Sequence, residues 1–390
     1  MPRFPRFSDR LLQLSGSVFE KFLPKMREKG ADLVKLHIGD SYLPPPYELP
    51  VDPQFLAAHP HFNRYCNTMG VPELREALAE KVNTDNGLKA TADDIMLTAG
   101  ASNALTVSMM SIVNPGEEVL VLTPCWPFFP GMVKLAGGVV REVSLYSRLY
   151  AEPELSIEEL LAAQLSDKTV AIYLNSPNNP SGKVLNRTQL ASVAAFAKKH
   201  SLWLLSDEAY DGMTFDGNEH ISVGSFPGMF EQTLSIFTFS KVFMFAGLRL
   251  GYIAAPHELL KQMNKALVHI LYSPSTLAQQ MMVEPVKQRK TWSSAFVEHC
   301  HELRDIISGG LEIPHIVPEG GYYLFFDMSP NLFGRDYWQL IDDCLEAGVS
   351  IAPGKDFGND FHSYIRICFA GESPDRLKIA ADRLNSVLLP

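Results

Sequence analysis

Short apolar runs alternate with helical patterns through the middle of the chain. The runs are four or five residues long and mostly apolar on both faces, as expected for strands buried between two layers of helices. They cover 119–123, 170–174, 202–206, 234–238 and 251–255. Helices are predicted over 72–82, 103–113 and 186–200, the last with Asn186 as N-cap and Gln189 closing a capping box. Strands that alternate with helices predict an α/β domain with a mostly parallel sheet.

The pattern changes towards both ends of the chain. Pro44-Pro45-Pro46 predicts an extended stretch that suits a crossing between domains. After residue 280, long helical stretches such as 292–308 precede a few strands, which is typical of a smaller α+β domain. We therefore predict two domains: a large one over 46–280, and a small one formed by 1–45 and 281–390.

Composition and charge limit the possible partners. The 390 residues are 46% hydrophobic and carry a net charge of −10, which argues against a nucleic-acid partner. The five cysteines are scattered, without a CxxC motif or a Cys/His cluster, so reduced cysteines and no metal site are expected. No apolar run is long enough for a membrane span, and 1–14 lacks the apolar core of a signal peptide. A cytoplasmic protein is the resulting prediction.

Two segments end a predicted strand in a loop that suits a ligand. Thr98-Ala-Gly100-Ala-Ser102-Asn103 runs through glycine into a helix, whose first backbone N–H groups attract an anion. Asn175-Ser-Pro-Asn-Asn179-Pro-Ser-Gly182 follows a strand, at the edge where ligands bind in open α/β sheets. An ordinary turn stays open as the alternative for each, since Asn-Pro and Ser-Gly are turn formers.

Two further segments carry charge into apolar surroundings. Asp207 and Glu208 follow the strand at 202–206, and carboxylates at the end of a buried strand need a partner. Lys241 lies in a Phe- and Met-rich segment, eight residues before Arg249. Desolvation lowers the pKa of a lysine and makes its amine a nucleophile. From the residues alone, a solvated strand end and a surface lysine stay open as alternatives.

In this order the four segments resemble the signatures of the class I and II aminotransferases, the aspartate-aminotransferase superfamily of fold type I enzymes that use pyridoxal 5′-phosphate (PLP). The shared pattern is Gly-Ala-Ser, Asn-x-Pro-x-Asn-Pro-x-Gly, Asp-Glu-x-Tyr, and Ser-Lys with Gly-x-Arg-x-Gly. Flanking matches are Tyr65 with Gly70, Pro124-Cys-Trp126, Pro353-Gly354 and Tyr364-Ile-Arg366. The resemblance extends from Gly39 to Arg366, and it implies the PLP-transferase type of α/β fold.

The resemblance implies roles at the cofactor. Lys241 is the expected Schiff-base lysine, whose freed amine moves a proton between substrate and cofactor. Asp207 is expected to pair with the pyridine nitrogen, which improves the ring as an electron sink. Glu208 has no implied role. The other expected contacts are Tyr210 and Asn179 at the ring 3′-oxygen, Trp126 on the ring face, and Ala101, Ser102, Thr238, Arg249 and Tyr65 at the phosphate.

The resemblance also implies how substrates and subunits meet. Arg366 is expected to clamp the substrate α-carboxylate with its planar fork, beside Gly39 and Asn179. Tyr65 in this family reaches the phosphate of the neighbouring subunit, which implies a homodimer with shared active sites. The loop after Gly39 is longer than the family's usual version, so side-chain recognition stays open. Its candidates are Ser15, Ser17 and Tyr42.

The expected reaction moves an amino group between an L-amino acid and a 2-oxo acid by a ping-pong mechanism. Ser102 stands where bacterial relatives of the aspartate type often carry a lysine, so an apolar or aromatic substrate side chain is expected. Arg10, Lys21 or Lys25 is the alternative source of a cation for an acidic substrate.

Other functions share the same cofactor residues. A PLP-dependent C–S or β-lyase and a cyclopropane-forming synthase stay open as alternatives. A PLP-binding regulatory domain is disfavoured, because the family motifs begin by Gly39 and the net charge is wrong for DNA. A non-catalytic relic is disfavoured by the presence of Lys241, Asp207 and Arg366.

Overall fold

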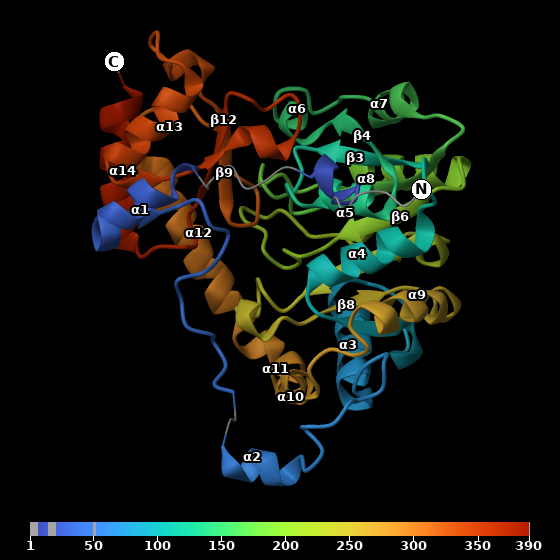
Figure 1. The fold of residues 1–390 in the computed structure, drawn as a ribbon. Coiled ribbons are helices and arrows are strands. Elements are labelled where there is room, and N and C mark those ends of the chain that lie inside the picture. Colours follow the sequence, from blue (N-terminus) through green and yellow to red (C-terminus); the bar gives the residue numbers. More distant parts are fainter. Residues whose placement is uncertain (1–6, 15–20, 50–51, 390) are drawn as a thin grey trace.

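The computed structural model of the protein describes residues 7–14, 21–49 and 52–389. A seven-stranded sheet forms its centre, in the order β2-β8-β7-β6-β5-β3-β4 (Figure 1). Neighbouring strands are parallel except β8, which is antiparallel to both β2 and β7. The strands are β2 (Ile95–Thr98), β3 (Glu118–Thr123), β4 (Val139–Ser144), β5 (Thr169–Asn175), β6 (Trp203–Asp207), β7 (Thr233–Thr238) and β8 (Gly251–Ala254).

Helices cover both faces of this sheet (Figure 1). Successive residues of a strand pack alternately into the core on one face and the core on the other. Val119 and Val121 of β3 pack into one core with α4 (Ala101–Ile112), α5 (Phe129–Ala136) and α9 (His257–Ile270). Leu120 and Leu122 pack into the other with α6 (Tyr146–Ala151), α7 (Ile157–Gln164) and α8 (Arg187–Lys199). The apolar runs are therefore apolar on both faces because both faces are buried, and the predicted α/β fold is confirmed.

Each strand and helix predicted above is present, and α8 begins with the expected capping box of Asn186 and Gln189. The antiparallel direction of β8 was not predicted. Because the segment from β7 to β8 contains only the short 3-10 turn Ala246–Leu248, no crossover helix brings the chain back to the same edge. β4 was not predicted, because Arg141 and Glu142 interrupt its apolar residues and Val143 is the one buried residue of the strand.

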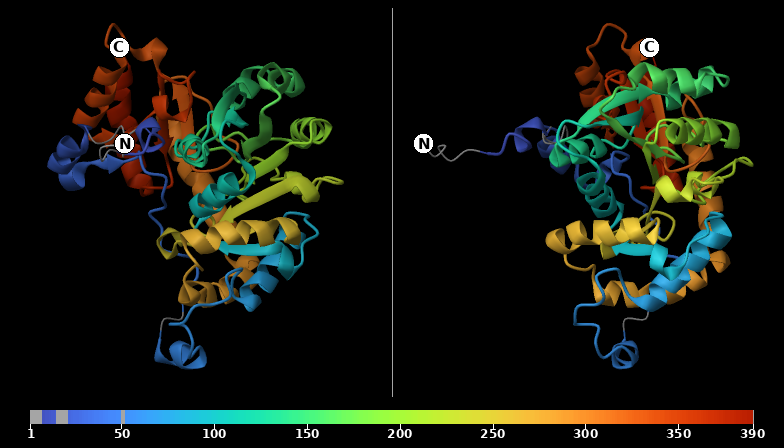
Figure 2. Two further views of the ribbon diagram at one scale, coloured as in Figure 1. Left: turned by 45° about the vertical axis from the view of Figure 1, so that its right-hand side comes forward. Right: turned by 90° about the vertical axis from the view of Figure 1, so that its right-hand side faces the viewer.

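Both chain ends contribute to a second group of elements beside the sheet (Figure 2). A parallel pair joins β1 (Val34–Lys35) to β10 (Val349–Ser350), and an antiparallel sheet has the order β11-β12-β9. Its strands are β9 (Tyr323–Asp327), β11 (Ala352–Pro353) and β12 (Tyr364–Cys368). The helices here are α1 (Leu23–Lys29), α12 (Ser293–Gly310), α13 (Tyr337–Glu346) and α14 (Pro374–Leu388). Division into domains of 46–280 and 1–45 with 281–390 stays a prediction.

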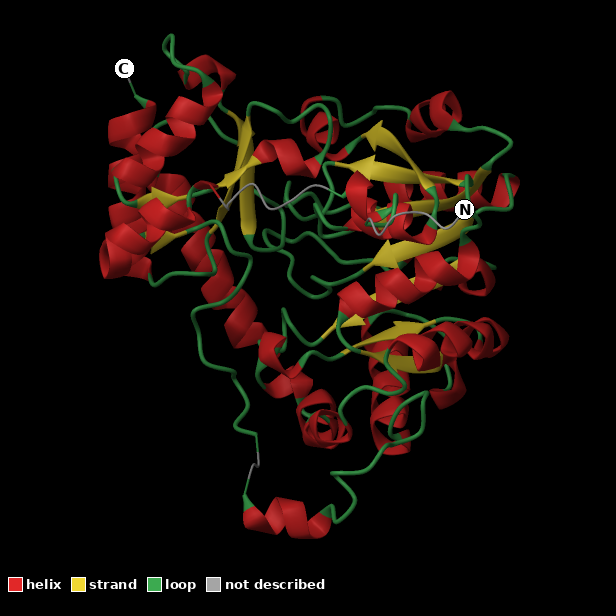
Figure 3. Cartoon of the chain, in the orientation of Figure 1, coloured by secondary structure: helices red, strands yellow, loops and turns green. Residues whose placement is uncertain are grey.

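Of the remaining helices, α3, α10 and α11 lie beside the β2 edge, and α2 lies apart from the sheet at the bottom of the view (Figure 3). They are α2 (Pro53–Ala58), α3 (Pro72–Asp85), α10 (Thr276–Met281) and α11 (Val283–Lys287). Among the described residues, no helix combines the length and the apolar character needed to cross a membrane.

The crossing at 318–321 fixes the small antiparallel sheet to two loops of the large one. Backbone N–H groups of Glu319 and Gly320 donate to the Gly182 carbonyl at 3.0 Å, and Gly321 donates to Met213 at 2.9 Å. The Glu319 carboxylate accepts from Lys183 Nζ at 2.6 Å and from the Val184 N–H at 2.9 Å. Because β9 follows this crossing directly, its position is set by the loops after β5 and β6.

We predict that Gly182→Ala destabilises the protein more than Gly217→Ala does. Both glycines have positive φ, +69° and +77°, but a Cβ at Gly182 would lie 2.2 Å from Pro318 Cβ, whereas Gly217 has open space. We expect Gly217→Ala to lower the free energy of unfolding by about 1 kcal/mol. Gly182→Ala should cost roughly 3 kcal/mol because the crossing must move. Denaturant unfolding measures the free energy of unfolding of both variants. Equal losses would contradict the prediction, because they would show that the 318–321 crossing moves at no energetic cost.

Candidate active site

The predicted site residues gather at the carboxyl edge of the central sheet. Asn175 at the end of β5 pairs in register with Asp207 at the end of β6, and Asp207 pairs with Ile236 of β7. Because parallel neighbours end at the same edge, the loops after these three strands meet there. They carry Asn179, Tyr210 and Lys241, and β9 and β12 lie beyond them (Figure 1).

Asp207 is a buried carboxylate with neutral partners. Tyr173 Oη donates to its Oδ2 at 2.8 Å, and the Ala209 N–H donates to its Oδ1 at 3.2 Å. No basic side chain among the described residues forms an ion pair with it. Burial raises the pKa of Asp207 to about 6, against the opposing effect of these two donors. Its negative charge is therefore available to a cationic ligand group.

Lys241 follows β7 and points its amine towards the segment after β1. Its Nζ donates to the Gly39 carbonyl at 2.6 Å, and its own carbonyl accepts from Tyr322 Oη at 3.0 Å. Burial lowers the pKa of the Lys241 amine. A partly desolvated amine held by a carbonyl is suited to act as a nucleophile or as a proton acceptor.

Thr238, Arg249 and the start of α4 meet on adjacent strand ends. Thr98 and Thr238 both lie opposite Gly251 in the strand register. A Cβ on Gly251 would lie 2.9 Å from the Ala101 nitrogen, and one on Gly100 would lie 2.8 Å from Arg249 Nη2. The first N–H groups of α4, at Ala101 and Ser102, have no acceptor within the helix. A guanidinium beside a free helix N-terminus fits an anion such as a phosphate.

Arg366 is a buried cation on β12. Its Nη1 donates to Asn179 Oδ1 at 3.0 Å and its Nη2 to the His37 carbonyl at 2.7 Å, while its buried Nε has no acceptor among the described residues. The guanidinium lies over the rings of Tyr323 and Phe357, at 4.4 and 5.0 Å from their centroids. Only 7% of Arg366 is exposed, and neutral groups surround it, which suits an incoming carboxylate.

Three contributing residues escaped the sequence analysis. Tyr173 donates to Asp207, Tyr323 Oη lies 2.8 Å from Tyr210 Oη, and the His37 carbonyl holds Arg366. Burial, together with the positive charge of Arg366, lowers the pKa of His37 to about 4. Tyr173 and Tyr323 both lie in apolar strands. Their hydroxyls meet a partner only because of how neighbouring strands and loops are aligned, and the sequence pattern does not reveal that alignment.

The remaining predicted residues lie at the edge of this group or outside it. Trp126 is half-buried, and Phe128 packs edge-on against it. Tyr65 is 81% exposed, and its ring contacts Tyr272. Tyr42 donates to or accepts from His299 Nε2 at 2.8 Å, on α12. Ser15 and Ser17 lie outside the described residues.

Glu208 is turned away from this group. It is buried, and His220 Nε2 lies 2.9 Å from its Oε2, to which the Ser222 hydroxyl also donates. Neighbouring strand residues point to opposite faces, which separates Glu208 from Asp207.

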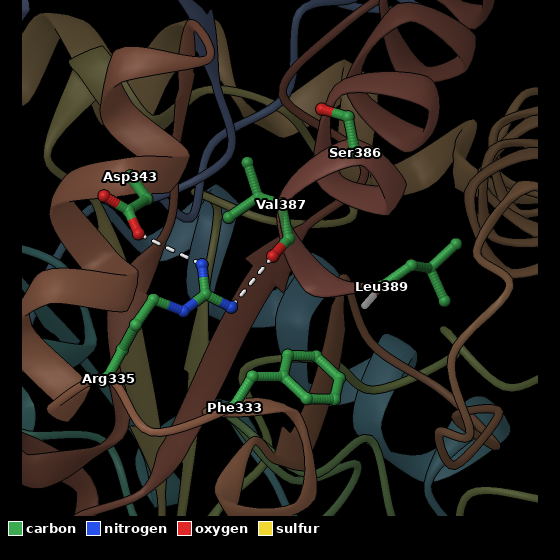
Figure 4. A pocket seen from close by; sticks show the side chains of 6 residues that line it. All are labelled: Phe333, Arg335, Asp343, Ser386, Val387 and Leu389. Atoms are coloured by element: carbon green, nitrogen blue, oxygen red, sulfur yellow. Dashed lines mark hydrogen bonds and ion pairs between the residues drawn. The ribbon is translucent and has the colours of Figure 1, made fainter.

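A separate hollow of about 590 Å³ lies between α13 and α14 (Figure 4). Arg335 lines it, but Arg335 is fully engaged: Nη1 bonds Asp343 at 3.0 Å and Nη2 bonds the Val387 carbonyl at 2.9 Å. None of the predicted site residues lines this hollow. The described residues also contain no cluster of three or more His, Cys, Asp or Glu side chains that could hold a metal ion.

Comparison with known proteins places this arrangement in a family. The family model for aminotransferase class I and II matches residues 31–384. The chain is 34% identical to an aspartate/prephenate aminotransferase of Thermus thermophilus, over 93% of each chain. It is 33% identical to aromatic-amino-acid aminotransferase 2 of Thermococcus litoralis, over 83% of this chain and 84% of that one. A solved double mutant of Thermus thermophilus aspartate aminotransferase superposes with a TM-score of 0.87, at 33% identity and over 99% and 100% of the two chains.

The members of this family depend on PLP, and the named relatives transfer amino groups. The match covers nearly the whole chain, including each loop that brings Asp207, Lys241 and Arg366 to one edge. This chain is therefore an enzyme that belongs to the class I and II aminotransferases.

Proposed function

We propose that this aminotransferase holds PLP on Lys241 and moves an amino group between an L-amino acid and a 2-oxo acid by a ping-pong mechanism. The observation that carries the proposal is the convergence of three charged groups, the buried Asp207 and Arg366 and the half-buried Lys241, each held by neutral partners. The relatives compared above are named as aminotransferases, which favours transfer over a C–S or β-lyase or a cyclopropane-forming synthase.

The residues present fit the cofactor group by group. When bound, PLP supplies an electron sink for charge that develops at the substrate α-carbon. Asp207 would pair with its pyridine nitrogen, Trp126 would cover one ring face, and Tyr210 would donate to the 3′-oxygen. The phosphate would bind the N–H groups of Ala101 and Ser102, the Thr238 hydroxyl and the Arg249 guanidinium.

Asn179 has a fixed orientation that supports this assignment. Its Oδ1 accepts from Arg366 Nη1, so its amide nitrogen points away from the guanidinium and stays a donor. That donor would share the ring oxygen with Tyr210. On the substrate side, Arg366 would bind the α-carboxylate beside Gly39, and Lys241 would take the proton from the α-carbon.

We propose an apolar or aromatic substrate side chain. An acidic side chain needs a second cation, because an unpaired buried carboxylate is heavily penalised. Ser102 brings no charge, and the three alternative cations have partners elsewhere. Lys25 pairs with Asp342 and Glu346, Lys21 lies over the Trp338 ring at 3.4 Å, and Arg10 donates to the Leu135 carbonyl at 3.2 Å.

We predict that Lys241→Ala abolishes transamination while the protein still folds and binds PLP without a covalent link. The reason is that Lys241 holds its amine at the sheet edge where Asp207 and Arg366 also lie, bonded to the Gly39 carbonyl. Borohydride reduction of the wild-type protein with PLP, followed by peptide mapping, should label Lys241. A label on another lysine would contradict the assignment. Lys183→Ala, which removes a half-buried lysine from the loop after β5, is the control and should leave the label on Lys241.

We predict opposite effects of Asp207→Asn on stability and on activity. Since burial raises the pKa of this carboxyl from 3.8 to about 6, the folded apoprotein loses stability as pH rises between these values. Above pH 6, Asp207→Asn should therefore stabilise the apoprotein, by up to about 3 kcal/mol, with no gain near pH 4. Turnover should fall by several orders of magnitude. Urea unfolding across this pH range and steady-state kinetics test both, and near-normal turnover would make Asp207 a structural residue.

We predict that kcat/KM is higher for phenylalanine or leucine than for aspartate or glutamate. A tenfold preference for an acidic substrate, about 1.4 kcal/mol, would show that a second cation serves the distal carboxylate. Ser102→Lys should shift the preference towards aspartate, because it adds a cation at the start of α4. Ser102→Gln has a similar bulk without the charge, and the same shift in this control would rule out an electrostatic cause.

We further propose a homodimer with shared active sites, and we predict that two inactive chains complement each other. The exposed Tyr65 contacts Tyr272, beside the exposed Ile270 and Leu271 at the end of α9. Such a cluster suits an interface that would carry Tyr65 to the phosphate of the second subunit. Mixing Lys241→Ala chains with Tyr65→Phe chains should restore sites that hold both native residues. An active monomer by light scattering would refute this.

A further inference from the structure

Tyr323 contacts both halves of the proposed site from a single position. It is the first residue of β9 and is 1% exposed. Its Oη lies 2.8 Å from Tyr210 Oη, and its ring lies 4.4 Å from the Arg366 guanidinium carbon. A Cβ on Gly39 would lie 2.1 Å from the Tyr323 hydroxyl, so that hydroxyl fills the space above this glycine.

The hydrogen bond between Tyr210 and Tyr323 has only one direction that leaves Tyr210 able to donate elsewhere. Burial raises the pKa of both phenols well above their usual range, so each keeps its single proton at neutral pH. If Tyr210 donated to Tyr323, it would have no proton for a ligand oxygen. With a ligand oxygen as the acceptor for Tyr210, Tyr323 is therefore the donor in this pair, and its proton would direct the Tyr210 proton towards the ligand side.

The ring of Tyr323 performs a second task at Arg366. Asn179 and the His37 carbonyl hold two nitrogens of the guanidinium in its plane. The rings of Tyr323 and Phe357 lie within about 5 Å of the guanidinium carbon and restrict its tilt. A carboxylate that binds the fork in two places depends on this plane.

Tyr323 is itself held rigidly enough to align two partners. It pairs with Cys368 in the register of β9 and β12, the strand that carries Arg366. Two residues before it, Gly321 donates to the Met213 carbonyl, and Met213 donates to the Tyr210 carbonyl at 2.9 Å. The backbones of Tyr323, Arg366 and Tyr210 are thus tied to one another by hydrogen bonds.

We propose that Tyr323 is a positioning residue for the reaction, whose hydroxyl orients the proton of Tyr210 and whose ring orients the guanidinium plane of Arg366. The inference rests on the proposed function, because it takes Tyr210 as the donor to the cofactor oxygen and Arg366 as the carboxylate clamp. The effect on Tyr210 and the effect on Arg366 can be tested separately, since the first depends on the Tyr323 hydroxyl and the second on its ring.

Two variants separate the hydroxyl from the ring. Tyr323→Phe keeps the ring, so KM for the amino acid should stay within about twofold, while apoprotein affinity for PLP should fall about fivefold, as for a lost hydrogen bond. The pH midpoint of the absorbance of bound PLP should rise, because Tyr210 then donates less effectively to the ring oxygen. Tyr323→Leu should show the same losses and also raise KM about tenfold for amino acid and 2-oxo acid alike.

Tyr337→Phe is the matched control. Its hydroxyl lies against the same small sheet, where it donates to the Tyr364 carbonyl and accepts from the Gly354 N–H, away from Tyr210 and Arg366. It should lower the melting temperature, as Tyr323→Phe does, yet keep PLP affinity, the absorbance midpoint and KM at their wild-type values. A control that moves these three readouts as far as Tyr323→Phe would overturn the proposal, because any lost hydroxyl would then suffice.

The remaining outcomes are equally decisive. Wild-type affinity and midpoint in Tyr323→Phe would overturn the role of the hydroxyl, and equal KM values in the Phe and Leu variants would overturn that of the ring. If the Leu variant does not fold, Tyr323→Trp replaces it, since a larger ring should displace Arg366 and raise KM. Wild-type protein that neither binds PLP nor transaminates would overturn the proposed function, and this inference with it.

Discussion

The burial of Arg366 without a carboxylate is the constraint on which the arrangement of the site depends. A buried guanidinium is strongly destabilising unless its N–H groups and faces are satisfied. Here an amide oxygen and a backbone carbonyl accept from Nη1 and Nη2, two aromatic rings cover the faces, and Nε lacks an acceptor among the described residues. These partners come from the loop after β5, the segment after β1, β9 and the turn at Phe357. Four parts of the chain must therefore converge on one side chain. Because none of these partners is charged, the positive charge remains available to a substrate carboxylate.

The same principle governs the other two charged groups. Asp207 is held by a phenol and a backbone N–H, and Lys241 by a backbone carbonyl, so dipoles and not counter-ions hold them in place. A counter-ion would stabilise the apoprotein, but it would also compete with the cofactor or the substrate. Burial makes a negative charge on Asp207 unfavourable in the folded protein and so raises its pKa. A buried charge that destabilises the apoprotein is typical of a site that is preorganised for a charged ligand.

The sequence predicted the sheet and the charged residues better than it predicted their partners. Apolar runs of four or five residues mark the strands because both faces of the sheet are buried, and the order of motifs singled out Asp207, Lys241 and Arg366. Tyr323 escaped because 113 residues separate it from Tyr210, so no local pattern links them. The direction of β8 escaped because apolar periodicity is the same for parallel and antiparallel strands. Asp207 and the equally buried Glu208 point to opposite faces because of strand alternation, which the presence of two adjacent carboxylates does not by itself reveal.

The link between Arg366 and Asn179 has a consequence for how substrate binding reaches the cofactor side of the site. Asn179 Oδ1 accepts from the same guanidinium that would bind the α-carboxylate, and the amide nitrogen is the proposed donor to the ring oxygen. A carboxylate that drew the Arg366 fork towards itself would weaken or tilt this bond, and the amide would turn with it. Tyr323 would resist the accompanying tilt, because its ring lies on the guanidinium and its strand is tied through the 318–321 crossing to the loop of Tyr210. The two proposed ring-oxygen donors would therefore respond differently to substrate: Asn179 would follow Arg366, while Tyr210 would be kept in place, so the hydrogen bonding of the ring oxygen would change only in part.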